Sequence, residues 1–178
     1  MKKLLLVGMI LVTMSSCGWQ HRTIINGVDL DRVKQGKALH IIGGALAAMA
    51  IHEGGHMLAM KITGAKDIEY IPPAEFHYNS SGMTNGEMQW VSRSGFIAEN
   101  LIGSILTNLE GTKNSGFTIG YAGAAAAQTI LYPLPPGETT DIYELQKLGG
   151  KAWFEYGGYS LWSLYNLDQA LGKEKKEK

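Results

Sequence analysis

The sequence contains only one cysteine, Cys17, so a disulfide cannot form within a single molecule. It also lacks an excess of either charge, since lysine plus arginine and aspartate plus glutamate number 16 each. No bulk charge points to nucleic acid or to an acidic substrate, and we expect no nucleic acid among its partners. Charged residues are scarce, at 18%, whereas 45% of the residues are hydrophobic and 23 are glycines. This composition favours closely packed helices or a protein that lies near a membrane.

The N-terminal segment has the features of an export signal. Lys2 and Lys3 precede the apolar run LLLVGMILVTM, which is too short to span a bilayer and is typical of a secretory signal peptide. The following M-S-S-C resembles the lipobox of bacterial lipoproteins, with Met14 at the position where leucine is commonest. That resemblance implies a signal peptide over residues 1–16 and lipidation of Cys17. An ordinary signal peptide followed by a lone cysteine is the alternative.

A lipid on Cys17 would anchor the mature chain to a membrane of the bacterial cell envelope. Residues 17–36 are polar and mixed, and we interpret them as a lipidated tether with little regular structure. Gly18 provides no aspartate of the kind that retains lipoproteins in the inner membrane. The outer membrane is therefore the expected destination if the cell is Gram-negative.

The longest predicted element is a helix from Lys37 to about Thr63. The segment has no proline, is rich in alanine and is followed by Gly64, a residue that commonly ends helices. Its stretch from Leu39 to Met60 has few ionisable side chains and is long enough, at about 1.5 Å per residue, to cross a bilayer core.

The rest of the chain alternates turns with further apolar segments. Residues 65–92 contain turn dipeptides between short runs rich in aromatic and β-branched residues, which predicts a small β-hairpin. Three more helices are predicted over residues 94–109, 117–132 and 141–171. The second of these has no charged residue, so it is either deeply buried or membrane-spanning. The expected fold is mainly α: about four apolar helices in a bundle within one domain, 37–171, ahead of a charged tail, 172–178.

The first predicted helix contains H-E-G-G-H at residues 52–56. His52 and His56 are four residues apart and project from one face of a helix, where both can bind one metal ion. Glu53 lies about 100° further round the helix, so it can contact a metal-bound water without being a ligand. In zinc peptidases the ion lowers the pKa of that water, and the glutamate takes up its proton and later delivers it to the leaving amine. A packing helix whose histidines happen to be four apart is the structural alternative.

Small residues form a stripe beside the two histidines. Gly44, Ala48, Gly55 and Ala59 fall within about 60° of one another around the predicted helix. Each glycine costs about 1 kcal/mol relative to alanine in a helix interior, so the stripe needs a reason. It would let a neighbouring helix approach backbone to backbone.

Several segments resemble those of the site-2 proteases, which are intramembrane zinc metallopeptidases. AIHEGGHMLAMKITGAKDIEYI is similar to the active-site helix and following strand of that family, whose pattern is H-E-x-G-H. SGFIAENL resembles the G-P-x-x-N segment of the second core helix, with Asn100 in the asparagine's place and Phe96 in the proline's. QTILYPLPPGETTD resembles the N-x-x-P-x-x-P-x-D-G segment that supplies the third metal ligand. The resemblance covers roughly residues 40–145.

A catalytic zinc site needs three protein ligands and an open position. The resemblance implies that His52, His56 and Asp141 are the ligands. Glu99 is an alternative third ligand because it is the sole charge in its apolar segment and GFIAENL looks like the E-G-x-A-E-Y stretch of soluble gluzincins. A buried hydrogen bond to asparagine or serine is the structural alternative for Glu99. Asp168 is a further candidate, and Asp141 could equally be the N-cap of the last helix.

These observations predict a membrane-associated zinc metallopeptidase that hydrolyses peptide bonds, with Glu53 as catalytic base and a peptide or membrane protein as substrate. Two alternatives stay open. One is a non-catalytic envelope lipoprotein that keeps a metallopeptidase-like helical scaffold. The other is a soluble gluzincin-type peptidase on a lipid tether, for which Glu99→Gln would abolish zinc binding while Asp141→Asn would not.

Overall fold

The structure is a computed structural model of the chain, and it describes residues 24–25, 28–29, 38–71, 75–131 and 140–172. The expected signal peptide, Cys17 and the charged tail after residue 172 lie outside these residues. Within the segment predicted to be a tether, β1 (Ile24–Ile25) and β2 (Val28–Asp29) form a short antiparallel pair.

The described part of the chain is mainly helical, with a small antiparallel hairpin directly after the H-E-x-x-H helix, as predicted. Its helices are α2 (Ala38–Ile62), α3 (Asn85–Asn108), α4 (Gly116–Leu131), α5 (Asp141–Lys147) and α6 (Ala152–Leu171). The hairpin strands are β3 (Lys66–Ile71) and β4 (Glu75–Asn79). None of the helices in the described residues combines the length and the apolar character needed to cross a membrane.

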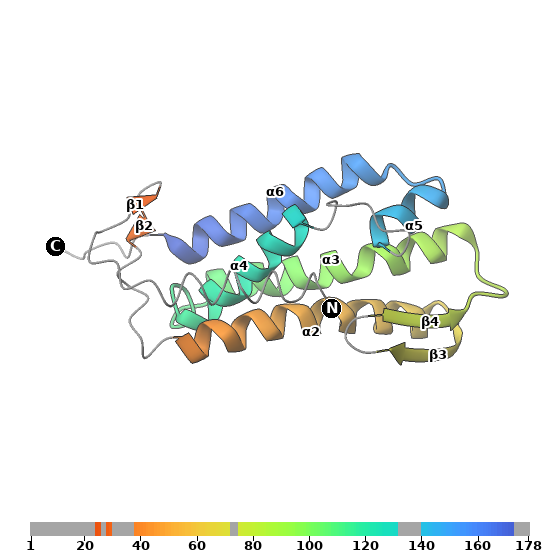
Figure 1. Cartoon of the computed structure of the whole chain (residues 1–178), viewed down its shortest axis with the longest axis horizontal. Helices are drawn as coiled ribbons and strands as arrows, with labels where there is room; N and C mark the ends of the chain where they lie inside the picture. Colours follow the sequence, from red (N-terminus) through yellow and green to blue (C-terminus); the bar gives the residue numbers. More distant parts are fainter. Residues whose placement is uncertain (1–23, 26–27, 30–37, 72–74, 132–139, 173–178) are drawn as a thin grey trace.

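The long helices lie side by side (Figure 1). α2 packs against α3 and α4, and both of these also contact α6. The short helix α5 contacts α3 and α6 at the end of the molecule that carries the β3–β4 hairpin. This arrangement brings the second half of α2 close to α5, although the two are far apart in the sequence.

The stripe of small residues on α2 brings the helix backbones together, as the sequence predicts. A Cβ atom added at Gly44 would collide with the Phe117 carbonyl oxygen of α4, and one at Gly55 would lie 2.6 Å from the Ser94 carbonyl oxygen of α3. Ala48, between the two glycines, is fully buried. The first half of α2 therefore rests on α4 and the second half on α3.

α3 begins at Asn85, well before Ser94, where the sequence pattern placed its start. Thr84 and Glu87 form a capping box: the Glu87 amide donates to the Thr84 hydroxyl oxygen at 3.3 Å, and the Thr84 amide donates to the Glu87 carboxylate at 2.7 Å. Such a cap satisfies amides that otherwise lack partners at a helix start. The extra turns carry Val91, whose carbonyl oxygen contacts His56.

The last predicted helix, 141–171, is two helices in the structure. α5 ends where Gly149 adopts a left-handed backbone, with φ of 82°, and the Gly150 amide donates to the Leu145 carbonyl at 2.9 Å. This is a glycine-terminated helix end. The break lets α5 turn across the end of the bundle.

One buried apolar cluster holds α5 in place. Its members come from α3, α5 and α6, and they are Phe96, Ile142, Leu145, Ala152 and Tyr156. Gln89 of α3 adds a hydrogen bond at 2.7 Å to the carbonyl oxygen of Leu148, just after α5. The orientation of α5, and of the aspartate at its start, is thus set by packing on both neighbouring helices.

Candidate metal centre

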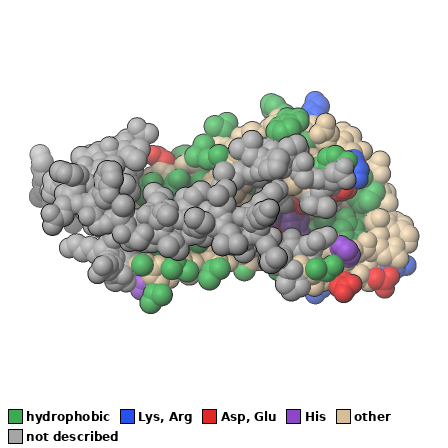
Figure 2. All heavy atoms as spheres, viewed as in Figure 1, with side chains coloured by type: hydrophobic (Ala, Val, Ile, Leu, Met, Phe, Trp, Pro, Cys, Tyr) green, Lys and Arg blue, Asp and Glu red, His purple; other side chains and the backbone are tan. Residues whose placement is uncertain are grey.

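His52 and His56 lie one turn apart on the buried side of α2. Their side chains are nearly inaccessible, with relative exposures of 1% and 6% for the two residues. The two Nε2 atoms are 3.1 Å apart, so the rings converge on one point. On the face shown in Figure 2, histidine side chains are visible towards the hairpin end of the molecule.

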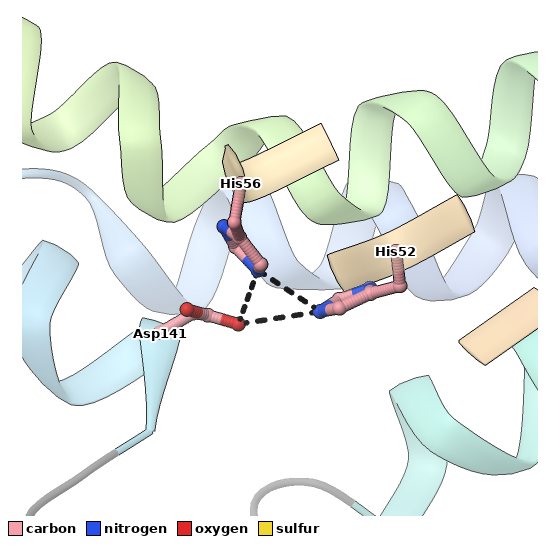
Figure 3. Close-up of side chains that lie close together, drawn as sticks. All are labelled: His52, His56 and Asp141. Carbon is pink, nitrogen blue, oxygen red and sulfur yellow. Dashed lines mark hydrogen bonds and ion pairs between the residues drawn. The ribbon is translucent and has the colours of Figure 1, made fainter. Parts of the chain in front are cut away.

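Asp141, the first residue of α5, faces this pair of rings (Figure 3). Its Oδ2 atom is 3.4 Å from Nε2 of His52 and 3.2 Å from Nε2 of His56. The three side chains form a group that could hold a metal ion. Two of its members come from α2 and the third from a helix much later in the chain.

The distances between the three atoms suit a tetrahedral ion. Zinc binds imidazole nitrogen and carboxylate oxygen at about 2.0–2.2 Å, which places neighbouring tetrahedral ligands about 3.3 Å apart. The observed separations of 3.1, 3.2 and 3.4 Å bracket this value. Two imidazoles and one carboxylate are also a donor set that zinc accepts.

The opposite nitrogens of the two rings contact α3. Nδ1 of His56 lies 2.7 Å from the Val91 carbonyl oxygen, and Nδ1 of His52 lies 3.4 Å from Oε2 of Glu99. A carbonyl or carboxylate oxygen can only accept, so each Nδ1 carries a proton and donates it. Both rings therefore turn Nε2 towards Asp141.

The start of α5 is capped by Thr140 and not by Asp141. The Thr140 hydroxyl accepts a hydrogen bond at 3.3 Å from the Tyr143 amide, while Asp141 occupies the first helical position. The interpretation of Asp141 as the N-cap is therefore wrong. Thr140 supplies the cap, and the aspartate carboxylate contacts the histidines.

Electrostatics couples the three side chains. Burial by itself lowers the pKa of His52, but the hydrogen bonds and charges of Asp141 and Glu99 outweigh it and raise the pKa to about 10. Burial by itself raises the pKa of Asp141, but the charges and hydrogen bonds of His56 and His52 outweigh it and hold that pKa well below its usual range. A cation is thus favoured at this position, either as a proton on the imidazoles or as a metal ion.

Glu53, the residue after His52, is half-buried beside this group. Burial raises the pKa of its carboxyl group, and the charges of His52 and His56 oppose part of that rise. A carboxyl group with a raised pKa can take up and release a proton nearer to neutral pH. This is the property that a general base and acid requires.

Gly95 of α3 leaves the space in which the two rings meet. A Cβ atom at this position would collide with Nε2 of His56 and lie 2.8 Å from Nε2 of His52. Sequence reasoning did not single out this residue. Its signal was present, since a glycine inside a predicted helix costs stability relative to alanine and therefore needs a reason.

Phe96 of α3 packs against the ring of His52. Its ring meets that of His52 edge to face, with centroids 4.8 Å apart. Phe96 also stacks on Tyr159 of α6, at 5.5 Å. Phe96 therefore bounds this side of the site with an apolar ring.

Comparison with protein-family models, characterised proteins and solved structures finds no match. The function is therefore inferred from the residues of the site themselves.

The other predicted site residues lie outside the converging group. The Glu99 carboxylate contacts the far side of the His52 ring instead of facing the two Nε2 atoms. Asp168 is exposed on α6, and His40 is exposed near the start of α2. Cys17, the predicted lipidation site, is not among the described residues.

Proposed function

We propose that the protein is a zinc metallopeptidase in which His52, His56 and Asp141 hold the ion and Glu53 is the catalytic base. The observation that carries this proposal is the convergence of three ligand atoms, 3.1–3.4 Å apart, beside the glutamate of an H-E-x-x-H helix. Three protein ligands are the number found at catalytic zinc sites, where a fourth position stays open for water or substrate.

The chemistry divides between the ion and the chain. When bound, zinc supplies a Lewis acid that lowers the pKa of a coordinated water towards neutrality. Glu53 accepts a proton from the attacking water as the new C–O bond forms, and it delivers this proton to the amide nitrogen as the C–N bond breaks. The raised pKa of Glu53 suits both transfers.

The β3–β4 hairpin is the proposed site for the substrate backbone. Side chains of Ile68, Phe76 and Tyr78 pack against the end of α2 that follows His56. An extended peptide that added a strand to this hairpin would lie close to the metal ligands, with its amide groups paired to the sheet. A peptide or a membrane protein with an unfolded segment is the substrate class that this mode accepts.

The proposed location is the bacterial cell envelope, with the lipid on Cys17 as anchor. Support comes from the N-terminal sequence, in which a signal-like apolar run leads to M-S-S-C. Cell fractionation of wild type and Cys17→Ala, followed by detergent extraction, tests the anchor. Equal membrane association of both proteins would contradict lipidation of Cys17.

The decisive test of the metallopeptidase is metal content together with cleavage. Protein purified without chelator should contain one zinc ion per chain, and His52→Ala and Asp141→Asn should each lose it. His40→Ala is the matched control because it removes an exposed histidine from the same helix. Glu53→Ala should keep the zinc and lose cleavage of casein or of a membrane peptide. A metal-free wild type would refute the proposal.

A further inference from the structure

Glu99 is a buried acidic side chain that the proposed reaction does not use. It lies in the middle of α3 with no exposed surface, and its Oε2 atom is 3.4 Å from Nδ1 of His52. Its other oxygen, Oε1, has no hydrogen-bond partner among the described residues. The Tyr121 hydroxyl donates to the backbone carbonyl of Glu99, at 3.0 Å, so it does not satisfy the carboxylate.

Burying a carboxylate costs several kcal/mol unless a partner compensates it. In the described part of the chain, His52 is the partner that the geometry provides. A position maintained only for packing would be better filled by leucine or methionine, because apolar residues carry no desolvation cost. The carboxylate therefore indicates a role that involves the imidazole.

The two histidines differ in the group that accepts a hydrogen bond from Nδ1. His56 donates from Nδ1 to the neutral carbonyl of Val91, whereas His52 donates to the carboxylate of Glu99. Metal-binding histidines commonly donate their second N–H to such an oxygen, which fixes the ring orientation and increases the basicity of the ligating nitrogen. Glu99 acts on the far side of the ring from Asp141, so it cannot replace Asp141 without a rotation of that ring.

We propose that Glu99 is a positioning residue, whose carboxylate fixes the His52 ring with its proton on Nδ1 so that Nε2 is presented to the metal. This inference rests on the proposed metal centre. It gives Glu99 a function different from that of a third ligand, and it explains why a single acidic residue is buried in an otherwise apolar stretch of α3.

The test compares Glu99→Met, which removes the acceptor, with Glu99→Gln, which keeps an acceptor oxygen and loses the charge. Zinc affinity is measured by competition with a chromophoric chelator. Removing the group that accepts a hydrogen bond from a metal-binding histidine weakens metal binding about 10–100-fold. We expect a loss in this range for Glu99→Met and a smaller loss for Glu99→Gln. Thr107→Val is the matched control, because Thr107 is also buried on α3 and its hydroxyl donates to the Ser104 carbonyl, away from the two histidines.

A second readout does not depend on metal. In protein labelled with ¹⁵N-histidine and treated with chelator, the Nδ1–H proton of His52 should resonate downfield and exchange slowly. This signal should move upfield or disappear in Glu99→Met, while the Nδ1–H signal of His56 stays as an internal reference. Circular dichroism establishes that each variant is folded, and Glu99→Gln serves if Glu99→Met does not fold.

The outcomes separate the two proposals. If wild type binds zinc and Glu99→Met binds it equally tightly with an unchanged His52 signal, the positioning role is overturned and the metal centre stands. If Glu99→Gln abolishes zinc binding while Asp141→Asn retains it, Glu99 is a ligand and the positioning role is overturned as well. If wild type binds no zinc, the metal centre itself fails.

Discussion

The point at which the two imidazole rings meet is left open by a residue without a side chain, Gly95. Because a Cβ atom there would collide with Nε2 of His56, Gly95→Ala should displace at least one ring. We expect zinc affinity to fall at least 10-fold while the protein remains helical. Chelator competition measures the affinity.

Gly123 provides the control for this substitution. It lies within α4, and a Cβ atom added there would meet no atom within 4 Å. Gly123→Ala should leave zinc affinity unchanged and add slightly to stability, since alanine favours the helix. Unaltered zinc binding by Gly95→Ala would mean that the rings do not hold the metal in the arrangement described.

How much of the site could be predicted from the sequence depends on how far apart in the sequence the interacting residues lie. The i, i+4 spacing of His52 and His56 is a property of one helix, so the sequence alone indicates that their rings share a face. The choice between Asp141 and Glu99 depends on which side of a ring each carboxylate reaches. That is set by the packing of α3 on α2 and of α5 on α3 and α6, which no local pattern encodes.

At the scale of elements, the glycines of α2 differ sharply in what surrounds them. Gly44 faces the backbone of α4, whereas the adjacent Gly43 has nothing within 4 Å of an added Cβ atom. Gly44→Ala should destabilise the fold by about 1–3 kcal/mol, because it forces two helices apart. Gly43→Ala should stabilise it by up to about 1 kcal/mol. Urea unfolding followed by circular dichroism compares the pair, and equal effects would contradict the close approach of α2 and α4.

An ion pair joins α3 to α6. Nη2 of Arg93 lies 2.9 Å from Oε1 of Glu155, and hydrogen bonding to Arg93 lowers the pKa of Glu155 below its ordinary value of 4.5. A carboxyl whose pKa is lower in the folded state stabilises the fold above its unfolded pKa, and this contribution is lost as pH falls through the folded pKa. Wild type should therefore be more stable than Glu155→Gln at pH 6, and the difference should shrink below about pH 4.5.

This pH dependence is measured as the urea midpoint of both proteins between pH 6 and pH 3. Chelator is present throughout, so that metal binding does not contribute. A difference that stays constant over this range would show that the pair of Arg93 and Glu155 adds nothing to folding stability. The effect is expected to be modest, because both side chains are partly exposed.

The ends of the helices show why the fold could be predicted only in part. The helical character of α2, α3, α4 and α6 and the presence of a hairpin follow from composition and turn residues. Thr84 and Glu87 form a capping box at the start of α3, but the Asn-Gly pair between them is also typical of a turn, so the sequence pattern alone does not place the helix start there. The end of α5 at Gly149 was missed because a glycine pair within an apolar segment is also compatible with a continuous helix.

For the molecule as a whole, the proposed zinc ion would connect α2 to α5, two elements far apart in the chain. A ligand that binds only the folded state stabilises it, by about 2.7 kcal/mol at a free concentration 100 times its dissociation constant. Adding zinc to metal-free protein should therefore raise the melting temperature. Asp141→Asn should reduce this rise, whereas His40→Ala should preserve it. Differential scanning calorimetry measures the shift, and an equal shift in Asp141→Asn would exclude a connection through α5.

The direct backbone contacts of α2 also have a kinetic consequence. Amides in the middle of this helix should exchange with deuterium only when the whole molecule unfolds, because neither α3 nor α4 can separate from it by side-chain motion alone. The two histidines consequently belong to the part of the molecule that opens last. α5 is short and is held by one apolar cluster, so its transient detachment is the easier route by which a metal ion could enter or leave. The lifetime of the bound ion would then report the opening of α5, and Leu145→Ala should shorten that lifetime without altering exchange in α2.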